Sequence, residues 1–558
     1  MIKRFPRFAS ALVAGLVFCL AAPHALGAKT GTRFEVSFSA AAHAGPITGR
    51  VFVIVGKSES PEPRLQVGSW GGQTPFFGVD VDQLKPGQTA VIDAGTLGYP
   101  VASLRDIPAG DYFVQALLNV YTRFPRSDGH VIWAHMDQWE GQQFNRAPGN
   151  LFSEIKKARL DPAAGYAVKL ELAKVIPPIE VPADTEWVKR VKLQSKLLTA
   201  FWGRPIDLGA TVVLPKGYDA HPDVRYPVVY NQGHFGLGAP FGFRADRAAE
   251  GRRGGHTGLY QAWISEDFPR LILVNFLHPT PYYDDSYAVD SANNGPYGQA
   301  IMTELIPYLE EHFRILRQPY ARLLTGGSTG GWESLALQVF HPDFFGGTWT
   351  FCPDPVDFRR FQLINIYSDA NAFLAPGGPW MVPERPMMRT VEGQVTQTVR
   401  QMSRLEDVLG SKGRSGQQFA AFEAVFGPVG DDGYPRPLWD RRTGKIDRDV
   451  ANYMRDHGYD LRHTIESRWP EIGPQLAGKL HFYCGDMDNY YLNLALYMLE
   501  AYLEKTTDPP YGGSFEWGRP MKGHGWSPLA TPELLKLMAE RVIQNGPKDA
   551  APAPWQYK

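Results

Sequence analysis

Apolar and polar residues alternate along the first third of the chain. A period of two runs through residues 34–38, 112–120 and 168–172, with glycine and proline between the runs. This spacing is typical of strands that bury one face and expose the other. Residues 29–180 are therefore expected to form an all-β, sandwich-like domain. No catalytic group of residues stands out there, so we expect a structural or docking role. The more specific alternative is a glycan-binding domain.

The pattern changes after a proline-rich linker at residues 177–182, where short apolar runs begin to alternate with helical stretches. Strand candidates lie at 188–198, 210–214, 226–230, 271–276, 322–325, 348–352, 480–484 and 514–517. Helical periodicity occupies residues 298–313 and 332–340. This alternation predicts a mainly parallel sheet covered by helices on both faces, in a domain spanning 181–545. Such sheets bind ligands beyond the carboxyl ends of their strands.

Residues 354–478 interrupt this alternation and are long for one crossover. They include a Pro-Gly-Gly-Pro stretch and several further prolines and glycines. We interpret them as an insertion that forms a lid or shapes the substrate site. The alternative is a surface segment without a functional role. Residues 546–558 are expected to be a tail.

The first 28 residues have the pattern of a secretory signal peptide. Lys3, Arg4 and Arg7 precede an apolar stretch at 9–22, and small residues follow near Gly27. Cleavage there predicts a periplasmic or secreted protein; an uncleaved anchor is the alternative. No other stretch is long and apolar enough to cross a bilayer, so we expect no membrane association after cleavage.

Charge excludes one broad class of function. The chain has 57 basic and 58 acidic residues, so it lacks the basic excess typical of proteins that bind nucleic acid. Composition gives no indication of the oligomeric state.

A glycine-rich stretch at 322–332 carries the first candidate for chemistry. Gly326, Ser328 and Gly330 fit the G-x-S-x-G pattern, a strand-to-helix turn that projects one serine into a cleft. Small neighbours are needed because the serine adopts a strained backbone conformation. Ser328 is therefore the candidate nucleophile, and a plain glycine turn before a helix is the alternative.

An acid and a base follow in the order expected of α/β-hydrolases. The apolar run at 480–484 ends in Gly485, and two carboxylates follow it. We favour Asp488 over Asp486 as the acid because it lies farther round the turn; an aspartate-rich surface turn is the alternative. His524, between two glycines, is the only histidine after Asp488, which makes it the candidate base.

An ester hydrolase also needs donors for the oxyanion of its tetrahedral intermediate. The backbone N–H of Thr329, which follows the serine, is one candidate. The loop after the strand at 226–230 should supply the other, and we nominate the N–H of Phe235. His234 precedes the serine and so has the wrong order for the base.

These stretches together resemble the putative-esterase family, which groups enterochelin esterase, feruloyl esterases, S-formylglutathione hydrolase and the mycolyltransferases. The matching segments are 225–230 with Gly233-His234, 295–298 leading into 304–308, 326–331, 485–488 and 523–526. The resemblance implies an α/β-hydrolase fold, no metal and no organic cofactor. In that family the acid commonly lies three residues after the strand-end glycine, which supports Asp488. The Gln-Gly-His turn, the long insertion and the β-rich front domain depart from the family pattern.

The resemblance also bears on the two cysteines that remain after signal cleavage. Cys352 and Cys484 each end a strand, and in this fold those strands are expected to be neighbours. An oxidising compartment allows a disulfide if the Cα atoms lie within about 7 Å. Two inert buried thiols are the alternative.

The sequence thus predicts a periplasmic or secreted serine hydrolase that cleaves carboxylic esters through an acyl-enzyme. Its substrate is expected to be a small-molecule or glycan-linked ester. Two alternatives stay open: an acyltransferase or peptidase with the same three residues, and a glycan-binding protein with a vestigial hydrolase domain.

Overall fold

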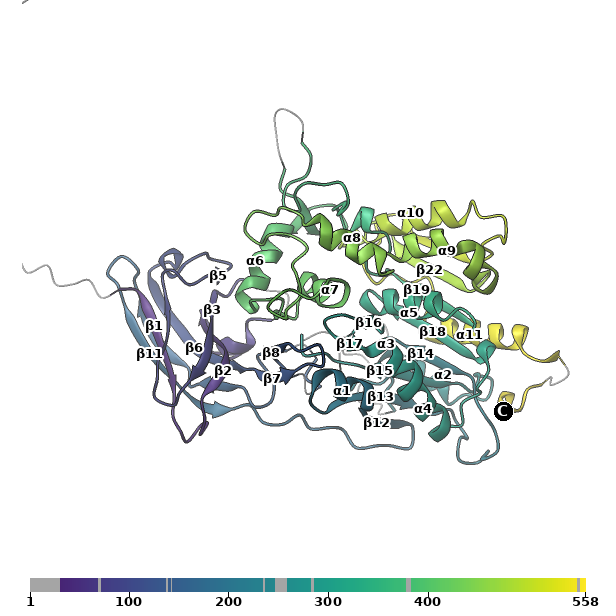
Figure 1. Ribbon diagram of the computed structural model, residues 1–558. Helices are drawn as coiled ribbons and strands as arrows, with labels where there is room; N and C mark the ends of the chain where they lie inside the picture. Colours follow the sequence, from purple (N-terminus) through teal and green to yellow (C-terminus); the bar gives the residue numbers. More distant parts are fainter. Residues whose placement is uncertain are drawn as a thin grey trace, which may run out of the picture.

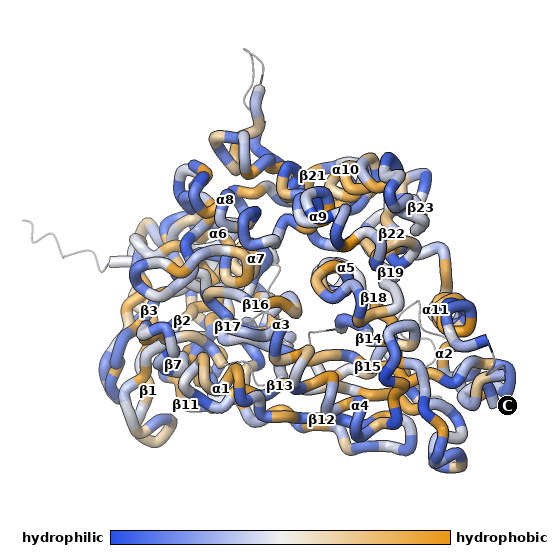
Figure 2. The backbone as a smooth tube through the Cα atoms, turned by 45° about the vertical axis from the view of Figure 1, so that its right-hand side comes forward, coloured by the Kyte–Doolittle hydropathy of each residue, from blue (hydrophilic) through white to orange (hydrophobic). Residues whose placement is uncertain are grey.

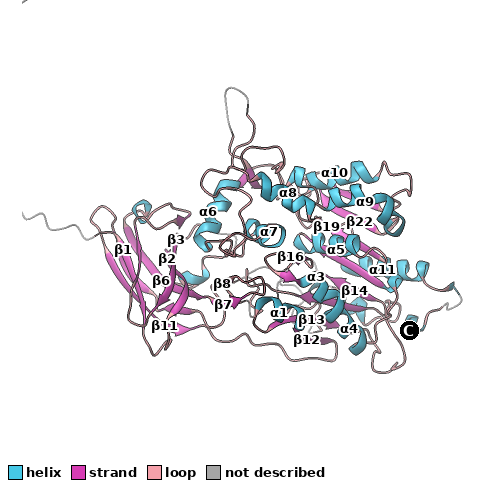
Figure 3. Cartoon of the chain, in the orientation of Figure 1, coloured by secondary structure: helices cyan, strands magenta, loops and turns pink. Residues whose placement is uncertain are grey.

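The computed structural model describes residues 31–68, 72–136, 139–141, 143–233, 236–245, 258–282, 286–377, 383–548 and 552–557. Two large sheets make up most of the described chain, and each lies at one side of the molecule (Figures 1 and 3). Helices α6 (Val399–Leu409) and α7 (Gln418–Phe426) lie between them in these views. The signal-peptide prediction falls outside the described residues.

The front sheet has nine strands, in the order β4-β1-β11-β9-β6-β2-β3-β5, with β10 also pairing with β6. The strands are β1 (Arg33–Phe38), β2 (Ile47–Gly56), β3 (Phe76–Leu84), β4 (Ala90–Asp93), β5 (Gly98–Tyr99), β6 (Gly110–Val120), β9 (Leu151–Ser153), β10 (Lys156–Leu160) and β11 (Ala167–Val175). A hairpin of β7 (Thr122–Pro125) and β8 (Val131–Ala134) follows β6. The alternating runs predicted as strands form β1, β6 and β11.

Strand β2 is buried on both of its faces. Val51 and Val53 point into the core of the front sheet, whereas Phe52 and Ile54 belong to the core shared with the rest of the chain. This double burial explains the unbroken apolar run at residues 51–55 of β2, which contrasts with the alternating pattern of half-exposed strands such as β11.

The second sheet has eight strands, in the order β12-β13-β15-β14-β18-β19-β22-β23. The strands are β12 (Val188–Ser195), β13 (Ile206–Val213), β14 (Val228–Asn231), β15 (Ile272–Leu277), β18 (Arg322–Gly327), β19 (Gly347–Phe351), β22 (Leu480–Gly485) and β23 (Ser514–Gly518). Strands β12 and β13 are antiparallel to their neighbours, and β14 to β23 pair in parallel. Figure 2 shows β13 mostly hydrophobic, as expected of a covered strand. The predicted, mainly parallel sheet is confirmed.

The helices are α1 (Lys196–Trp202), α2 (Leu259–Trp263), α3 (Tyr297–Ala300), α4 (Ile306–His312), α5 (Thr329–Phe340), α6 (Val399–Leu409), α7 (Gln418–Phe426), α8 (Arg448–Asp456), α9 (Leu461–Leu476), α10 (Asn493–Leu503) and α11 (Thr531–Asn545). A π-helical turn at Ile301–Leu305 joins α3 to α4 within the predicted helix 298–313. The strand expected at 188–198 ends earlier, because the side chain of Ser195 accepts a hydrogen bond from the N–H of Leu198 and starts α1 there.

The insertion is an integral part of the fold. It contains α6, α7, α8, α9 and the hairpin of β20 (Pro386–Arg389) and β21 (Val395–Thr398). Helix α6 packs against β3 and β5 of the front sheet. The guanidinium of Arg50 on β2 donates to the carbonyl oxygens of Asp407 and Val408 at the end of α6. A small hairpin of β16 (Asp290–Ser291) and β17 (Gly295–Pro296) adjoins α7. The insertion therefore joins the two sheets through one continuous core.

Among the helices in the described part of the chain, none combines the length and hydropathy needed to span a membrane.

Candidate active site

Four loops that follow neighbouring parallel strands carry the site. Ser328 follows β18, Cys352 follows β19, Asp488 follows β22 and His524 follows β23, and these strands are adjacent in this order. The carboxyl ends of parallel strands lie at one edge of a sheet. The sequence prediction that the catalytic candidates follow strands therefore corresponds to one edge of the structure.

Ser328 lies in a strained turn between β18 and α5. Its φ of 58° and ψ of −124° lie outside the regions that a residue with a side chain prefers. The N–H of Ser328 donates to the carbonyl oxygen of Phe351 at 3.0 Å, which fixes the turn against β19. Strain of this kind persists only where the surroundings impose it, and it is common at active sites.

Close backbone approach explains three of the four glycines around this serine. A Cβ on Gly326 would lie 2.1 Å from the carbonyl oxygen of Gly330, and one on Gly330 would lie 2.1 Å from that of Gln232. A Cβ on Gly331 would lie 2.6 Å from the carbonyl oxygen of Phe351. At Gly327 the nearest atom would be 3.8 Å away, an ordinary contact.

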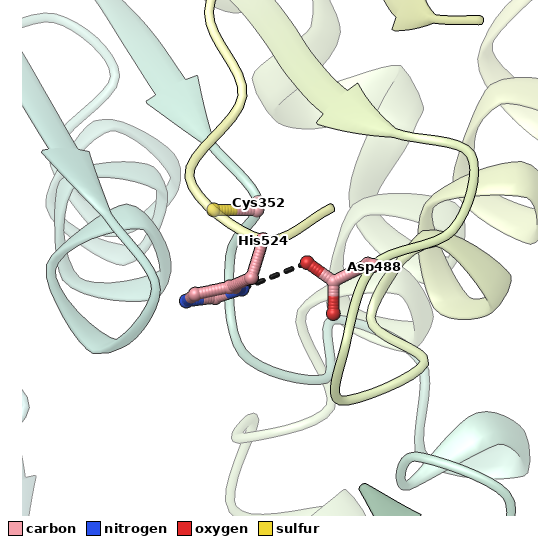
Figure 4. Close-up of side chains that lie close together, drawn as sticks. All are labelled: Cys352, Asp488 and His524. Atoms are coloured by element: carbon pink, nitrogen blue, oxygen red, sulfur yellow. Dashed lines mark hydrogen bonds and ion pairs between the residues drawn. The ribbon is translucent and has the colours of Figure 1, made fainter. Parts of the chain in front are cut away.

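Asp488 is fully buried and holds the ring of His524. The Nδ1 of His524 lies 2.7 Å from Oδ2 of Asp488, so Nδ1–H donates to the carboxylate (Figure 4). The other carboxylate oxygen accepts the N–H groups of Tyr490 at 2.9 Å and Leu492 at 3.2 Å. Asp486 instead accepts the N–H of Lys522 at 3.0 Å, so it supports the turn before the histidine.

The insertion supports the turn that carries the acid. Arg389 at the end of β20 donates from Nε to the carbonyl oxygen of Asp488 at 2.9 Å. Its guanidinium also lies over the ring of Tyr491, 4.3 Å from the ring centre. The backbone of the turn that carries the carboxylate is thus held by a segment about 100 residues earlier in the chain.

The His524 loop reaches back across the sheet edge. Strand β23 lies three strands from β18, about 14 Å at the usual spacing of strands. The N–H of Gly525 nevertheless donates to Sγ of Cys352 at 3.3 Å, above β19. Because β19 is the immediate neighbour of β18, this contact brings His524 to within one strand of the serine turn. In the described chain no hydrogen bond joins the Ser328 hydroxyl to the ring, and such bonds are often loose without substrate.

The surroundings of His524 favour its charged form. Burial alone lowers the pKa of the imidazole, but negative charge on Cys352 and on Asp488 and the hydrogen bonds to both raise it well above its ordinary value. The carboxylate of Asp488 lies beside the ring, where it stabilises an imidazolium.

A second buried carboxylate lies directly behind the serine turn, and sequence reasoning missed it. Asp354 accepts hydrogen bonds from the hydroxyls of Thr329 at 2.9 Å and Tyr287 at 2.8 Å, and from the amide of Gln418 at 3.2 Å. Burial raises the pKa of Asp354, and the two hydroxyl groups oppose that rise. Because Gln418 begins α7, this network ties the insertion to the first residue of α5.

Of the two candidate oxyanion donors, only Thr329 lies within the described residues. Thr329 is the first residue of α5, so its N–H has no partner within the helix and is free to serve a ligand. Phe235, together with His234, lies outside the described residues. The chain before it runs from β14 to Gln232, whose backbone touches the serine turn at Gly330.

The structure holds Cys352 and Cys484 as two free, buried thiols. Their strands are neighbours, as expected, since β19 pairs with β22. Of the two alternatives that the sequence leaves open, a disulfide and two buried thiols, the structure has the thiols, and each sulfur has its own contact. Sγ of Cys352 accepts the N–H of Gly525, and Sγ of Cys484 donates to the carbonyl oxygen of Gly485 at 3.5 Å. The contact of Cys352 with the histidine loop had no signal in the sequence.

Comparison with known proteins gives a family match and a set of similar structures. Residues 205–381 match the family described as putative esterase. A ferulic acid esterase is 16% identical and covers 64% of this chain and 96% of its own, with a TM-score of 0.32. The S-formylglutathione hydrolase of Agrobacterium tumefaciens is 14% identical, with coverages of 64% and 98% and a TM-score of 0.32. That of Staphylococcus aureus is 12% identical, with coverages of 64% and 99% and a TM-score of 0.31. Among curated proteins, none matches significantly.

The strand order, the strained serine turn and the family match define the class. The second sheet with its helices has the α/β-hydrolase fold, and the protein is a carboxylic ester hydrolase of the serine-hydrolase type. Within that class, the match to the putative-esterase family covers residues 205–381.

Proposed function

We propose that the chain hydrolyses carboxylic esters with Ser328 as nucleophile, His524 as base and Asp488 as the acid that orients the ring. Ser328 attacks the acyl carbon while His524 accepts its proton and then passes it to the leaving alcohol. The N–H of Thr329 donates to the oxyanion, and a second donor comes from the loop after β14. Water then attacks the acyl-enzyme and releases the acid.

One observation carries this proposal: the 2.7 Å contact between His524 and the buried carboxylate of Asp488, at the sheet edge where Ser328 occupies its strained turn. A buried acid behind a histidine fixes the ring so that Nε2 is the nitrogen left to accept a proton. A solvated surface turn would not bury an aspartate to 0% exposure and give it two backbone donors besides.

We further propose that the substrate is a small-molecule or glycan-linked ester and that the protein works in the periplasm or outside the cell. The basic start, apolar stretch and small residues of the first 28 positions support export. Sequencing the N-terminus of protein expressed with its full leader tests this, and the expected new terminus lies next to Gly27.

Turnover of p-nitrophenyl acetate and labelling by a fluorophosphonate test the chemistry. Ser328→Ala should abolish both while thermal unfolding stays close to that of the parent protein. Ser527→Ala, in an exposed stretch near the histidine, is the matched control and should keep both. Unchanged turnover in Ser328→Ala would falsify the proposal. A panel of acetyl, feruloyl and long-chain esters, with amides and alcohol acceptors, then separates hydrolase from peptidase and acyltransferase.

A further inference from the structure

Three side chains with metal-binding atoms converge beside the serine turn. The nearest donor atoms of Cys352, Asp488 and His524 all lie within 4.8 Å of one another. Figure 4 shows them on three separate loops, with a hydrogen bond between Asp488 and His524. Cys352 is 1% exposed and Asp488 0%, whereas the side chain of His524 is 23% exposed, so solvent reaches the cluster past the ring.

The donor set has a chemical preference. A thiolate, an imidazole nitrogen and a carboxylate oxygen are the three ligand types of protein-bound zinc. The sulfur favours zinc and other thiophilic cations over magnesium and calcium, which prefer oxygen ligands alone. Zinc that is held by three protein ligands keeps a fourth position open to water.

The spacing is close to what such an ion requires. Zinc bonds of about 2.0–2.3 Å in tetrahedral geometry put ligand atoms roughly 3.3–3.8 Å apart. The 2.7 Å contact of Asp488 with His524 must open by about 0.6 Å, and the widest separation, up to 4.8 Å, must close by about 1 Å. A Cβ on the adjacent Gly525 would meet nothing within 4 Å, so the histidine loop is open on that side.

Cys352 is held in this position against the preference of its backbone. Its φ of 33° lies in the left-handed region, which is unfavourable for a residue with a side chain. A glycine would adopt this conformation more easily, so the surroundings impose strain on Cys352. The sulfur of Cys484, on the neighbouring strand, is equally buried but lies outside the cluster.

We propose that Cys352, His524 and Asp488 form a binding site for a thiophilic divalent cation such as Zn²⁺, and that occupation reversibly stops ester hydrolysis. Binding displaces the thiol proton of Cys352 and the Nδ1 proton of His524 to solvent, and the carboxylate that held the latter binds the ion instead. The ring can then no longer be oriented by Asp488 as a base. The inhibitory part rests on the proposed function, whereas the binding part does not.

Cobalt tests the binding without any activity measurement, because a thiolate bound to Co²⁺ gives a charge-transfer absorption. Ser328→Ala, which keeps all three ligands, should show that absorption with one equivalent of Co²⁺, and Zn²⁺ should displace it. The same titration in Cys352→Ala should show no such band. Cys484→Ala is the matched control, since it removes the other buried thiol and should behave as the parent protein does.

Inhibition is then measured in the active protein. Zn²⁺ should inhibit turnover of p-nitrophenyl acetate, EDTA should restore it, and the inhibition constant should rise at least about tenfold in Cys352→Ala, since even outer partners of ligands contribute that much. Cys352→Ser, closer in size, replaces the alanine variant if that one does not fold. Equal Co²⁺ spectra in the parent and the Cys352 variants, or no Co²⁺ binding at millimolar concentration, would overturn the site. If Ser328→Ala still turned over ester, the proposed function would fail but the cobalt titration would stand.

Discussion

Replacing Gly330 by alanine should damage the active site through one contact. The added Cβ would lie 2.1 Å from the carbonyl oxygen of Gln232 and 3.0 Å from its Cβ. Ordinary contacts begin at 3.4 Å, so the closest pair is too close by about 1.3 Å. Neither partner can rotate away, because the nearest atom is backbone and the N–H of Gln232 is bonded to the carbonyl oxygen of Thr325 at 2.9 Å.

The first turn of α5 must therefore move away from β14, taking with it the serine hydroxyl and the Thr329 N–H. A misplacement of about 1 Å can reduce rates by roughly 10²-fold. Overpacking of this kind also destabilises by about 1–3 kcal/mol. We expect kcat/KM for p-nitrophenyl acetate to fall by about two orders of magnitude, with a fall in the thermal midpoint.

Gly327→Ala is the matched control, because its Cβ would have its nearest neighbours at 3.8 Å and its φ is not positive. It should retain the thermal midpoint of the parent protein and most of the activity. If Gly330→Ala kept kcat/KM within about threefold, the close approach would not matter. Equal losses in both variants would show that any added methyl here is harmful, whatever it touches.

Three further predictions concern the acid, a buried charge and the contact between the sheets. Asp488→Asn should keep the fold, because its side-chain oxygen can still accept the two N–H groups, but kcat should fall by about 10⁴; a loss below tenfold in steady-state assays would contradict its role. Burial raises the pKa of Glu406 to about 7, although Arg441 opposes the rise. An acid whose pKa is raised by folding costs stability as it ionises, so the thermal midpoint should fall between about pH 4.5 and 7, and less so in Glu406→Gln; parallel curves would refute this. Arg50→Ala removes buried bonds to α6 and should destabilise by about 3 kcal/mol in urea unfolding. Arg33→Ala, which breaks a half-exposed ion pair with Glu35, should change stability by less than 1 kcal/mol. Similar losses of stability in the two variants would show that the contact of Arg50 with α6 contributes no more than a surface ion pair.

Local patterns carried most of the fold prediction. The central strands of the second sheet are short apolar runs because both faces are covered, and this made them visible without any knowledge of their partners. The start of α1 was missed because one capping serine interrupts a run that also suits a strand. The serine turn was visible for a similar reason, since Gly326 and Gly331 are required by contacts inside the turn and with the next strand; only Gly330 is required by a distant segment, at Gln232.

Contacts between distant segments could not be predicted in the same way. The approach of Cys352 to the histidine loop depends on how far that loop folds back over the sheet, which no local pattern encodes. Asp354 follows a strand like the other candidates, but its partners on α5 and α7 come together only in the folded chain. One signal was available and unused: the unbroken apolar run of β2 indicated that something covers its outer face.

The double burial of β2 has a consequence for how the protein can be divided. Cutting the chain at the linker would uncover Phe52 and Ile54 on one fragment and the apolar side of the insertion on the other. Fragments of this kind expose contiguous hydrophobic patches and tend to aggregate. A soluble hydrolase core for crystallisation or engineering should therefore retain the front sheet, or carry polar replacements on the surface that its removal lays bare.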